Sequence, residues 1–251
     1  MIKLFVFDMD GTALPYGADR LSDGVLSALD ALAASGVRLA VASGRSPESL
    51  TRLLSPLKNP VYVIGHDGAI ARQDGRVVYR RPIPAESVRA YFRHPKNAGR
   101  TLLLYGEDTV YLRAGSGDAE AVADAEVRTV KIKNEYAIRE PIYKVAAYGG
   151  APMGATDPAL RPTYRTDAAE EYVYAYANKG VALSDLQTRL PVSVFDTVAA
   201  GDGRADLPLF ARAALTFAPD GAPEEIKAAA GLTGSFADFL AALAKATQNH
   251  P

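Results

Sequence analysis

The sequence predicts an α/β fold in which a parallel sheet forms the core and a smaller α+β module is inserted into it. Two observations predict this fold. Short apolar segments alternate with segments of helical periodicity in the first and last parts of the chain, and the early apolar segments end in polar residues. The middle part instead groups several strand-like segments with few helices. Alternating strands and helices are typical of a parallel sheet with right-handed crossovers, and a separate group of strands indicates a second module.

The N-terminal third contains the first three predicted strands. The apolar run after Met1 is short and rich in aromatic and β-branched residues, which favours a buried strand over a helix. Pro47 suits the first turn of a helix, and Gly36 suits the residue that ends one. We expect strands at residues 2–7, 37–42 and 61–64, and helices from residue 22 or 23 up to Gly36 and from 47 to 57.

The pattern changes near Arg81-Pro82-Ile83-Pro84. From there we expect a helix at 85–94, a hairpin of strands at 101–105 and 109–113, and strands at 142–148 and 171–177. Residues 149–162 hold three prolines and three glycines, so we expect a loop there. The helix–strand alternation then resumes, with helices at 181–190 and 207–213, a strand at 215–218 and two Ala-rich helical stretches.

This change of pattern predicts a discontinuous core. We expect a Rossmann-like core domain made of residues 1–81 and 179–251, and an α+β cap domain made of residues 82–178.

Composition restricts the class of protein. A hydrophobic content of 48% with 23% charged residues is ordinary for a globular protein, and a net charge of −1 gives no reason to expect nucleic acid or an anionic membrane as partner. The absence of cysteine excludes disulfides, thiolate metal sites and a cysteine nucleophile. We expect no signal peptide and no membrane span, hence a cytoplasmic protein that is a monomer or a small homo-oligomer.

Two carboxylates, Asp8 and Asp10, follow the first strand directly and precede Gly11 and Thr12. Ligands of open α/β sheets bind outside the carboxyl ends of the strands, so chemistry is expected at this point. Two neighbouring carboxylates repel each other unless a cation lies between them, and Mg²⁺ suits oxygen ligands with room for a phosphate. The alternative is an ordinary strand end with an Asx-type turn.

Asp8-Met9-Asp10-Gly11-Thr12 resembles the first motif of phosphatases of the haloacid dehalogenase (HAD) superfamily. Three later segments resemble the other motifs in the expected order: Ser43 with Gly44 and Arg45, then Lys179, then Gly201 to Asp206. Each has a plainer alternative when taken alone. Ser43 could cap the following helix, Lys179 could be a solvated lysine, and Asp202 and Asp206 could flank an ordinary turn.

The resemblance implies an aspartyl-phosphate mechanism. Asp8 would attack the phosphoryl group, and Asp10 would protonate the leaving alcohol and then activate water. Lys179 would offset the negative charge. The resemblance also implies a Mg²⁺ site formed by Asp8, the Asp10 backbone carbonyl, Asp202 and Asp206. It implies a phosphate site formed by the N–H groups of the turn at Gly11 and Thr12 together with Ser43, Gly44 and Lys179.

The inserted module resembles the type IIB cap of the Cof-like and sugar-phosphate phosphatase branch, and Asp67-Gly68-Ala69 resembles the Asn-Gly-Ala element of that branch. Two residues depart from the pattern. Ala205 stands where the branch usually has Asn, and Asp67 adds a carboxylate where a phosphate would approach. Arg204, beside the predicted site, could compensate for this carboxylate.

The function that we expect from the sequence is Mg²⁺-dependent hydrolysis of a small phosphorylated metabolite, in particular a sugar phosphate. Two alternatives remain open at this stage. One is a phosphomutase of related fold, which returns the phosphoryl group to the substrate instead of giving it to water. The other is a catalytically weak relative that binds a phosphorylated ligand, which Ala205 and Asp67 would favour.

Overall fold

The computed structural model describes residues 1–116, 127–154 and 157–248. The chain divides into two compact units, which are described separately. Unit 1 consists of Met1–Tyr79 and Asn178–Pro251, and unit 2 of Arg80–Ala177. Among the described residues, no helix is both long enough and apolar enough to cross a membrane.

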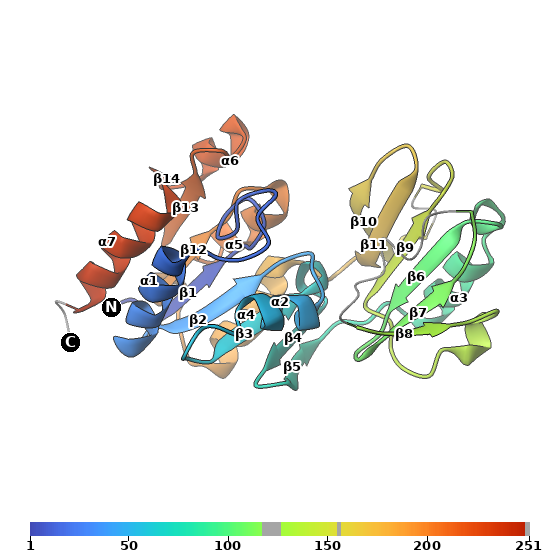
Figure 1. Ribbon diagram of the computed structural model, residues 1–251, viewed down its shortest axis with the longest axis horizontal. Helices are drawn as coiled ribbons and strands as arrows, with labels where there is room; N and C mark the ends of the chain where they lie inside the picture. The colour runs from blue at the N-terminus through green and yellow to red at the C-terminus, as the bar shows by residue number, and fades with distance from the viewer. Residues whose placement is uncertain (117–126, 155–156, 249–251) are drawn as a thin grey trace. The chain divides into compact units, whose positions relative to one another are not determined.

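Unit 1 is built on an eight-stranded sheet with the order β14-β13-β12-β1-β2-β3-β4-β5 (Figure 1). The strands are β1 (Leu4–Phe7), β2 (Arg38–Ala42), β3 (Val61–Gly65), β4 (Ile70–Gln73), β5 (Arg76–Arg80), β12 (Thr197–Ala200), β13 (Leu215–Pro219) and β14 (Leu232–Gly234). The pairings from β14 through β3 are parallel, which confirms the predicted parallel core, and β4 pairs antiparallel with β3. The central position of β1 explains why Leu4–Phe7 is fully buried.

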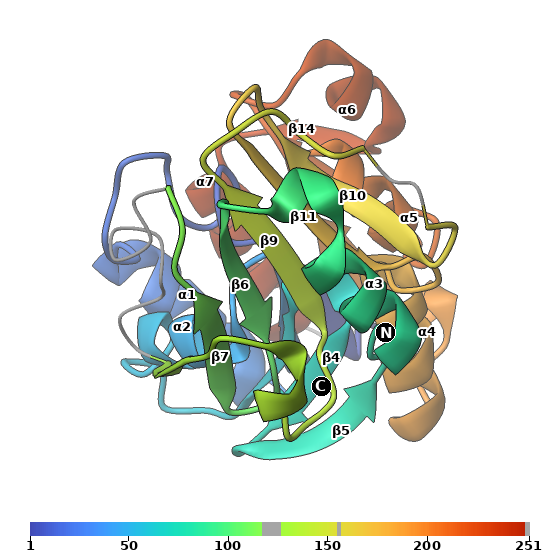
Figure 2. The same cartoon turned by 90° about the vertical axis from the view of Figure 1, so that its right-hand side faces the viewer.

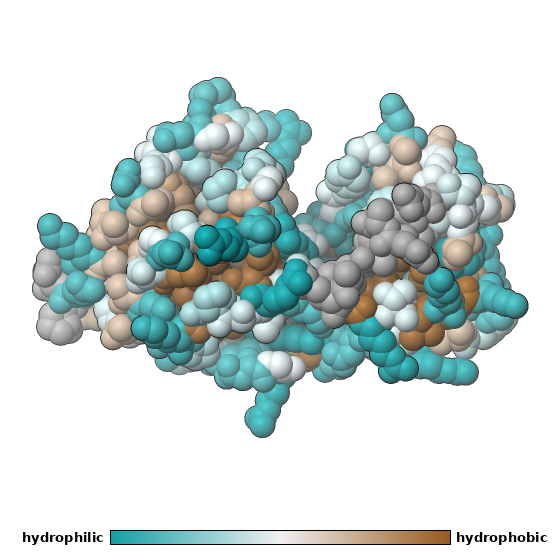
Figure 3. Space-filling model, viewed as in Figure 1, coloured by the Kyte–Doolittle hydropathy of each residue, from teal (hydrophilic) through white to brown (hydrophobic). Residues whose placement is uncertain are grey.

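Helices cover both faces of this sheet, as the crossover rule requires. The helices are α1 (Asp23–Ala34), α2 (Pro47–Leu53), α4 (Lys179–Arg189), α5 (Leu207–Phe210), α6 (Glu224–Ala229) and α7 (Phe236–Gln248). One apolar cluster joins α1, α2 and α7 to the sheet, and a second joins α4, α5 and α6 to its other side. Hydrophilic residues cover much of the face that is visible in Figure 3.

Unit 2 contains a six-stranded sheet with the order β10-β11-β9-β6-β7-β8. The strands are β6 (Thr101–Tyr105), β7 (Thr109–Arg113), β8 (Arg128–Lys131), β9 (Lys144–Tyr148), β10 (Leu160–Arg165) and β11 (Ala169–Tyr174). The pairs are antiparallel except for β7 with β8. Helix α3 (Ala85–Arg93) lies against this sheet (Figure 2), because Val88, Tyr91 and Phe92 pack on apolar side chains of β6 and β7.

Several local expectations were wrong: α2 ends at Leu53 and not at 57, and α5 ends at Phe210 and not at 213. Residues 160–162 belong to strand β10 and not to the predicted loop; β10 is an edge strand, where Pro162 removes no essential ladder hydrogen bond. Strand β11 ends at Tyr174, so residues 175–177 are not part of it. The prediction for residues 155 and 156 lies outside the described residues.

A buried ion pair lies in unit 2. Glu170 on β11 is fully buried and accepts hydrogen bonds from Arg100 Nη1 at 2.5 Å, the Tyr172 hydroxyl at 2.6 Å and the Met153 N–H at 2.8 Å. Burial by itself raises the pKa of Glu170, but these donors outweigh burial and hold the pKa below its ordinary value. Arg100 also donates to the Ala147 carbonyl at 2.9 Å. The pair therefore ties three segments of unit 2 together.

We expect Glu170→Gln to lower the free energy of unfolding by about 3 kcal/mol at pH 7, because the substitution leaves the buried Arg100 charge unpaired. A carboxylate whose pKa is lower in the folded than in the unfolded state stabilises the fold at pH values above its pKa in the unfolded chain. This contribution is lost as pH falls through its pKa in the folded state. The difference from the parent protein should therefore shrink below about pH 4. Urea unfolding at pH 7 and below about pH 4 checks this, with the exposed Glu86→Gln as control. A difference in unfolding free energy between Glu170→Gln and the parent protein that does not depend on pH would contradict the prediction.

Candidate active site

The strand order brings two of the predicted motifs together. Strand β1 pairs in parallel with β12, and Phe7 lies opposite Ala200. The Asp8 N–H continues this ladder by donating to the Ala200 carbonyl at 2.9 Å. Asp8 and Asp202 therefore leave neighbouring strand ends, at the carboxyl edge where ligands of such sheets bind. Both side chains are nearly buried.

Lys179, the first residue of α4, lies between two of the carboxylates. Its Nζ donates to Asp8 Oδ1 at 2.7 Å and to Asp206 Oδ1 at 2.6 Å, and the side chain is 4% exposed. Burial alone would lower the pKa of Lys179, but the carboxylates of Asp8, Asp206 and Asp67 raise it above its ordinary value. Lys179 is therefore a fixed buried cation and not the solvated lysine of the plainer alternative.

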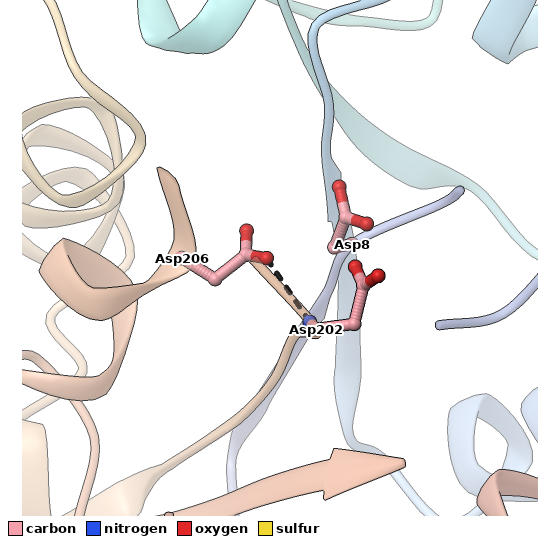
Figure 4. A group of neighbouring side chains, drawn as sticks. All are labelled: Asp8, Asp202 and Asp206. Atoms are coloured by element: carbon pink, nitrogen blue, oxygen red, sulfur yellow. Dashed lines mark hydrogen bonds between the residues drawn. The ribbon is translucent and has the colours of Figure 1, made fainter. Parts of the chain in front are cut away.

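The remaining charge in this cluster is negative. Asp8, Asp202 and Asp206 each offer an oxygen within 4.8 Å of the others (Figure 4). Three carboxylates face one ammonium, and burial raises the pKa of Asp8 in spite of the opposing Lys179 charge. Hard oxygen ligands with an excess of about two negative charges suit a divalent cation such as Mg²⁺. The residues present therefore fit a metal site.

Asp206 has a second task in the cluster. Its Oδ2 accepts the backbone N–H groups of Asp202 at 3.1 Å and Gly203 at 3.0 Å, and Figure 4 shows the first of these bonds. Its Oδ1 accepts from Lys179. Asp206 therefore fixes both the loop that carries Asp202 and the ammonium group of Lys179, and the segment is not the ordinary turn of the plainer alternative.

Asp10 lies apart from the three-carboxylate cluster. Both of its carboxylate oxygens accept hydrogen bonds from Arg45, from Nε at 2.8 Å and from Nη2 at 2.7 Å. The Asp10 side chain is 38% exposed. A bidentate guanidinium pair fixes the plane of a carboxylate as well as its position. Arg45 is thus a residue of the candidate site. The sequence places it directly after Ser43 and Gly44 but does not reveal that it pairs with Asp10.

The turn after Asp10 contains hydrogen bonds of its own. The Gly11 N–H donates to the Leu14 carbonyl at 2.8 Å, and the Thr12 N–H donates to the Met9 carbonyl at 3.3 Å. Both N–H groups thus donate within the turn in this structure. Thr12 Oγ1 donates to Asp202 Oδ1 at 3.3 Å.

Gly11 is required at its position for two reasons. Its φ of +81° favours glycine, and a Cβ there would lie 2.1 Å from Asp202 Oδ2. The glycine therefore allows the turn and the Asp202 carboxylate to approach each other.

Ser43 follows the end of β2, beside β1, and is buried. Its Oγ accepts the Arg45 N–H at 3.2 Å, whereas Ser46 caps α2 by accepting the Ser49 N–H at 3.2 Å. The capping alternative for Ser43 is therefore wrong. A Cβ on Gly44 would lie 3.2 Å from Asp67 Oδ1, so the carboxylate of Asp67 lies close to the predicted phosphate segment.

The sequence reasoning missed Tyr16. Its hydroxyl donates to Asp202 Oδ2 at 2.8 Å, and although 79% of the residue is exposed, desolvation and this bond raise the pKa of Tyr16 to about 12. The sequence feature that could have pointed to Tyr16 is its place as an aromatic residue in the Pro- and Gly-containing loop directly after the first motif. The same loop and the first motif help to line a cavity of about 610 Å³, to which Gly11, Thr12, Asp19 and Arg20 contribute.

Arg204 does not compensate for Asp67, contrary to the expectation. Its guanidinium is exposed and pairs with Glu225 on α6, from Nε at 2.5 Å and from Nη2 at 2.8 Å. The neighbouring Ala205 is also exposed.

Comparison with known proteins agrees with this geometry. A family model described as haloacid dehalogenase-like hydrolase matches residues 5–152 and 167–246. A Streptococcus pyogenes protein with the provisional name bifunctional phosphatase/peptidyl-prolyl cis-trans isomerase is 23% identical over 223 residues, which are 86% of this chain and 47% of that protein. The HMP-PP phosphatase of Yersinia pseudotuberculosis is 32% identical over 109 residues, 43% of this chain and 40% of that protein. The chain thus spans less than half the length of these curated relatives.

Solved structures show the same fold. A haloacid dehalogenase-like hydrolase from Bacteroides thetaiotaomicron superposes with a TM-score of 0.83 at 19% identity, covering 99% of both chains. A HAD subclass IIB sugar phosphatase superposes with a TM-score of 0.76 at 20% identity, covering 98% of both chains. These likenesses confirm the predicted HAD fold with its inserted α+β module. Because the family model also matches most of the sequence, the protein belongs to the haloacid dehalogenase-like hydrolase family.

Proposed function

We propose that the protein is a phosphatase that hydrolyses small phosphomonoesters, with Asp8 as nucleophile. The observation that carries the proposal is the contact of Lys179 Nζ with both Asp8 and Asp206 inside the three-carboxylate cluster. A buried ammonium that touches the nucleophile offsets the charge of an approaching phosphate, which would otherwise repel an anionic attacking group. A lysine that served only to neutralise surface charge would not be buried in this way.

Asp8 and Asp202 would hold Mg²⁺ directly, together with the Asp10 backbone carbonyl, while Asp206 supports Asp202 and Lys179. When bound, the cation would supply Lewis-acid stabilisation of the negative phosphoryl oxygens. Asp67, near Gly44, makes the phosphate end of the site more negative than an asparagine would. Ser43 Oγ and Lys179 Nζ are the donors that we assign to the phosphate.

We propose the following reaction for these residues. An Asp8 carboxylate oxygen attacks phosphorus, the ester P–O bond breaks, and Asp10 gives a proton to the leaving alcohol. Asp10 then takes a proton from water, whose oxygen attacks the aspartyl-phosphate and releases inorganic phosphate with regenerated Asp8. Arg45 fixes the plane of the Asp10 carboxylate through both of its oxygens and so orients Asp10 for this role. Arg45 is therefore a positioning residue.

For the substrate we propose a small phosphorylated metabolite of the sugar-phosphate class. The fold likeness to a subclass IIB sugar phosphatase supports this class, and the match to an HMP-PP phosphatase makes HMP-PP the first alternative substrate to test. We also propose that residues 82–178 act as the cap domain of the enzyme and residues 1–81 with 179–251 as its catalytic core.

The test is phosphate release from a panel of sugar phosphates and HMP-PP, with and without Mg²⁺. We expect release that needs Mg²⁺ and is fastest for one sugar phosphate. Isomer formation from mannose 1-phosphate with a bisphosphate activator, without phosphate release, would instead indicate a mutase. Tight ligand binding with turnover no faster than that of Asp8→Asn would indicate a binding protein.

We expect Arg45→Gln to lower kcat about 100-fold with little change in KM, because the general acid is no longer held in place. Arg45→Lys should recover only part of the loss, since an ammonium cannot bind both oxygens of Asp10 in a fixed plane. The loss should be smaller with p-nitrophenyl phosphate, whose leaving group needs little proton donation. Steady-state kinetics with both substrates check this, with Arg38→Gln as the exposed control. An equal loss on both substrates would contradict the positioning role.

A further inference from the structure

Unit 2 contains a cavity of about 480 Å³ that shares no residue with the candidate active site. Its floor is apolar: Ile83, Val88 and Ile142 are each less than 5% exposed. The Ile83 N–H donates to the Ile142 carbonyl at 2.8 Å, which joins two sides of the cavity. This volume lies within the range of pockets that bind small molecules. The cavity is therefore large enough and preformed enough to hold a compact apolar group.

Two arginines and two glutamates contribute to the walls, but their charges are not equivalent. Glu135 accepts hydrogen bonds from Arg93, which does not line the cavity. Glu140 Oε2 accepts the backbone N–H groups of Glu107 at 2.6 Å and Asp108 at 3.2 Å. Both carboxylates thus already accept hydrogen bonds from groups other than the two arginines that line the cavity.

The arginines are Arg89 on α3 and Arg139, both exposed at the cavity. Within the part of the chain that the structure describes, neither guanidinium has a hydrogen bond or ion pair within 4 Å; Arg89 interacts with Glu135 only at longer range. The cavity also meets the start of α3, where Pro84 has no side chain that could cap the first-turn N–H groups. Both features add positive potential to the cavity. Glu86, also in that first turn, is not among the lining residues.

We propose that this cavity binds a small organic carboxylate, with the guanidinium groups of Arg89 and Arg139 holding the carboxylate and the isoleucine and valine floor holding a compact apolar body. Guanidinium groups suit this task because their planar N–H groups match both oxygens of a carboxylate. The occupant would touch Pro82 to Pro84, the segment by which the chain enters unit 2. The proposal rests on unit 2 alone and holds whether or not the protein is a phosphatase.

The test is an NMR titration of the full chain, labelled with ¹⁵N, with 2-naphthoate. We expect saturable shifts of the amides near Ile83, Val88 and Ile138 with a Kd on the order of 1 mM, as suits so small a ligand. Arg89→Gln and Arg139→Gln should each weaken binding about tenfold. Arg128→Gln, an exposed arginine of β8 that does not line the cavity, should leave Kd unchanged. Neutral 2-naphthalenemethanol should bind about tenfold more weakly than 2-naphthoate.

Three results would overturn the proposal. No saturable shifts up to about 10 mM ligand would show that the cavity does not take this class of anion. Shifts centred on Asp8 and Ser43 would place the anion in the candidate active site instead. Equal Kd values for the parent protein and the double variant Arg89→Gln/Arg139→Gln would show that the arginines do not recognise the carboxylate.

Discussion

Asp8→Asn is expected to lower the rate of phosphate release at least about 10³-fold on the best substrate, because an amide cannot form the aspartyl-phosphate. The substitution keeps the shape of the side chain and can still accept from Lys179 Nζ, so the fold should remain. Burial raises the pKa of Asp8, which means that the folded state disfavours the ionised carboxylate. A neutral amide at this position should therefore not destabilise the protein seriously. Kinetics and urea unfolding of the same preparation check both expectations.

Asp238→Asn is the matched control, because Asp238 lies on α7, is exposed and does not line the cavity beside the first motif. It should keep nearly all of the parent rate. Acid-quenched samples of the parent protein with ³²P-labelled substrate should retain label on the chain, and Asp8→Asn should not. Retention of label by Asp8→Asn would place the nucleophile elsewhere, and an undiminished rate would remove the proposed mechanism.

The position of three of the four motifs at one edge of the sheet could be foreseen from the sequence. Asp8, Ser43 and Asp202 each follow a parallel strand, and the ends of such strands meet at one edge of the sheet. The hydrogen-bond partners could not be foreseen in the same way. That Arg45 turns to Asp10 and that Arg204 turns away to Glu225 depends on side-chain directions at irregular loops, where no periodicity constrains them.

The strands that the sequence reasoning missed have local causes. The hairpin of β4 and β5 turns at Asp74 and Gly75, both with positive φ, and Asp-Gly is a common hairpin turn, so this pair was readable. Strand β14 has only three residues and forms an edge, which gives too short an apolar pattern to recognise. The burial of Glu170 was not readable, because a charged residue enters a core only with partners that distant segments supply.

Lys179→Met is expected to lower the free energy of unfolding by about 3–5 kcal/mol at pH 8, because it leaves the buried carboxylates of Asp8 and Asp206 without their counter-charge. Phosphate release should also fall sharply. The pKa of Asp8 is raised by burial even in the parent protein, and removal of the ammonium raises it further. When a carboxyl group has a raised pKa in the folded state, the folded protein becomes more stable as pH falls through that pKa. The loss of stability in Lys179→Met relative to the parent protein should therefore be clearly smaller at pH 5 than at pH 8. Urea unfolding at both pH values measures this.

Lys58→Met, an exposed lysine of the same unit, is the control and should change stability by less than about 0.5 kcal/mol. The comparison also separates the two cations that we assign to the site. If Asp8 and Asp202 hold Mg²⁺, added Mg²⁺ should restore part of the stability of Lys179→Met, because a ligand that binds only the folded state stabilises it. The same addition should restore much less in the double variant Lys179→Met/Asp8→Asn. Equal recovery in both variants would mean that Mg²⁺ does not bind at Asp8, even if Lys179 and Asp8 remain essential to catalysis.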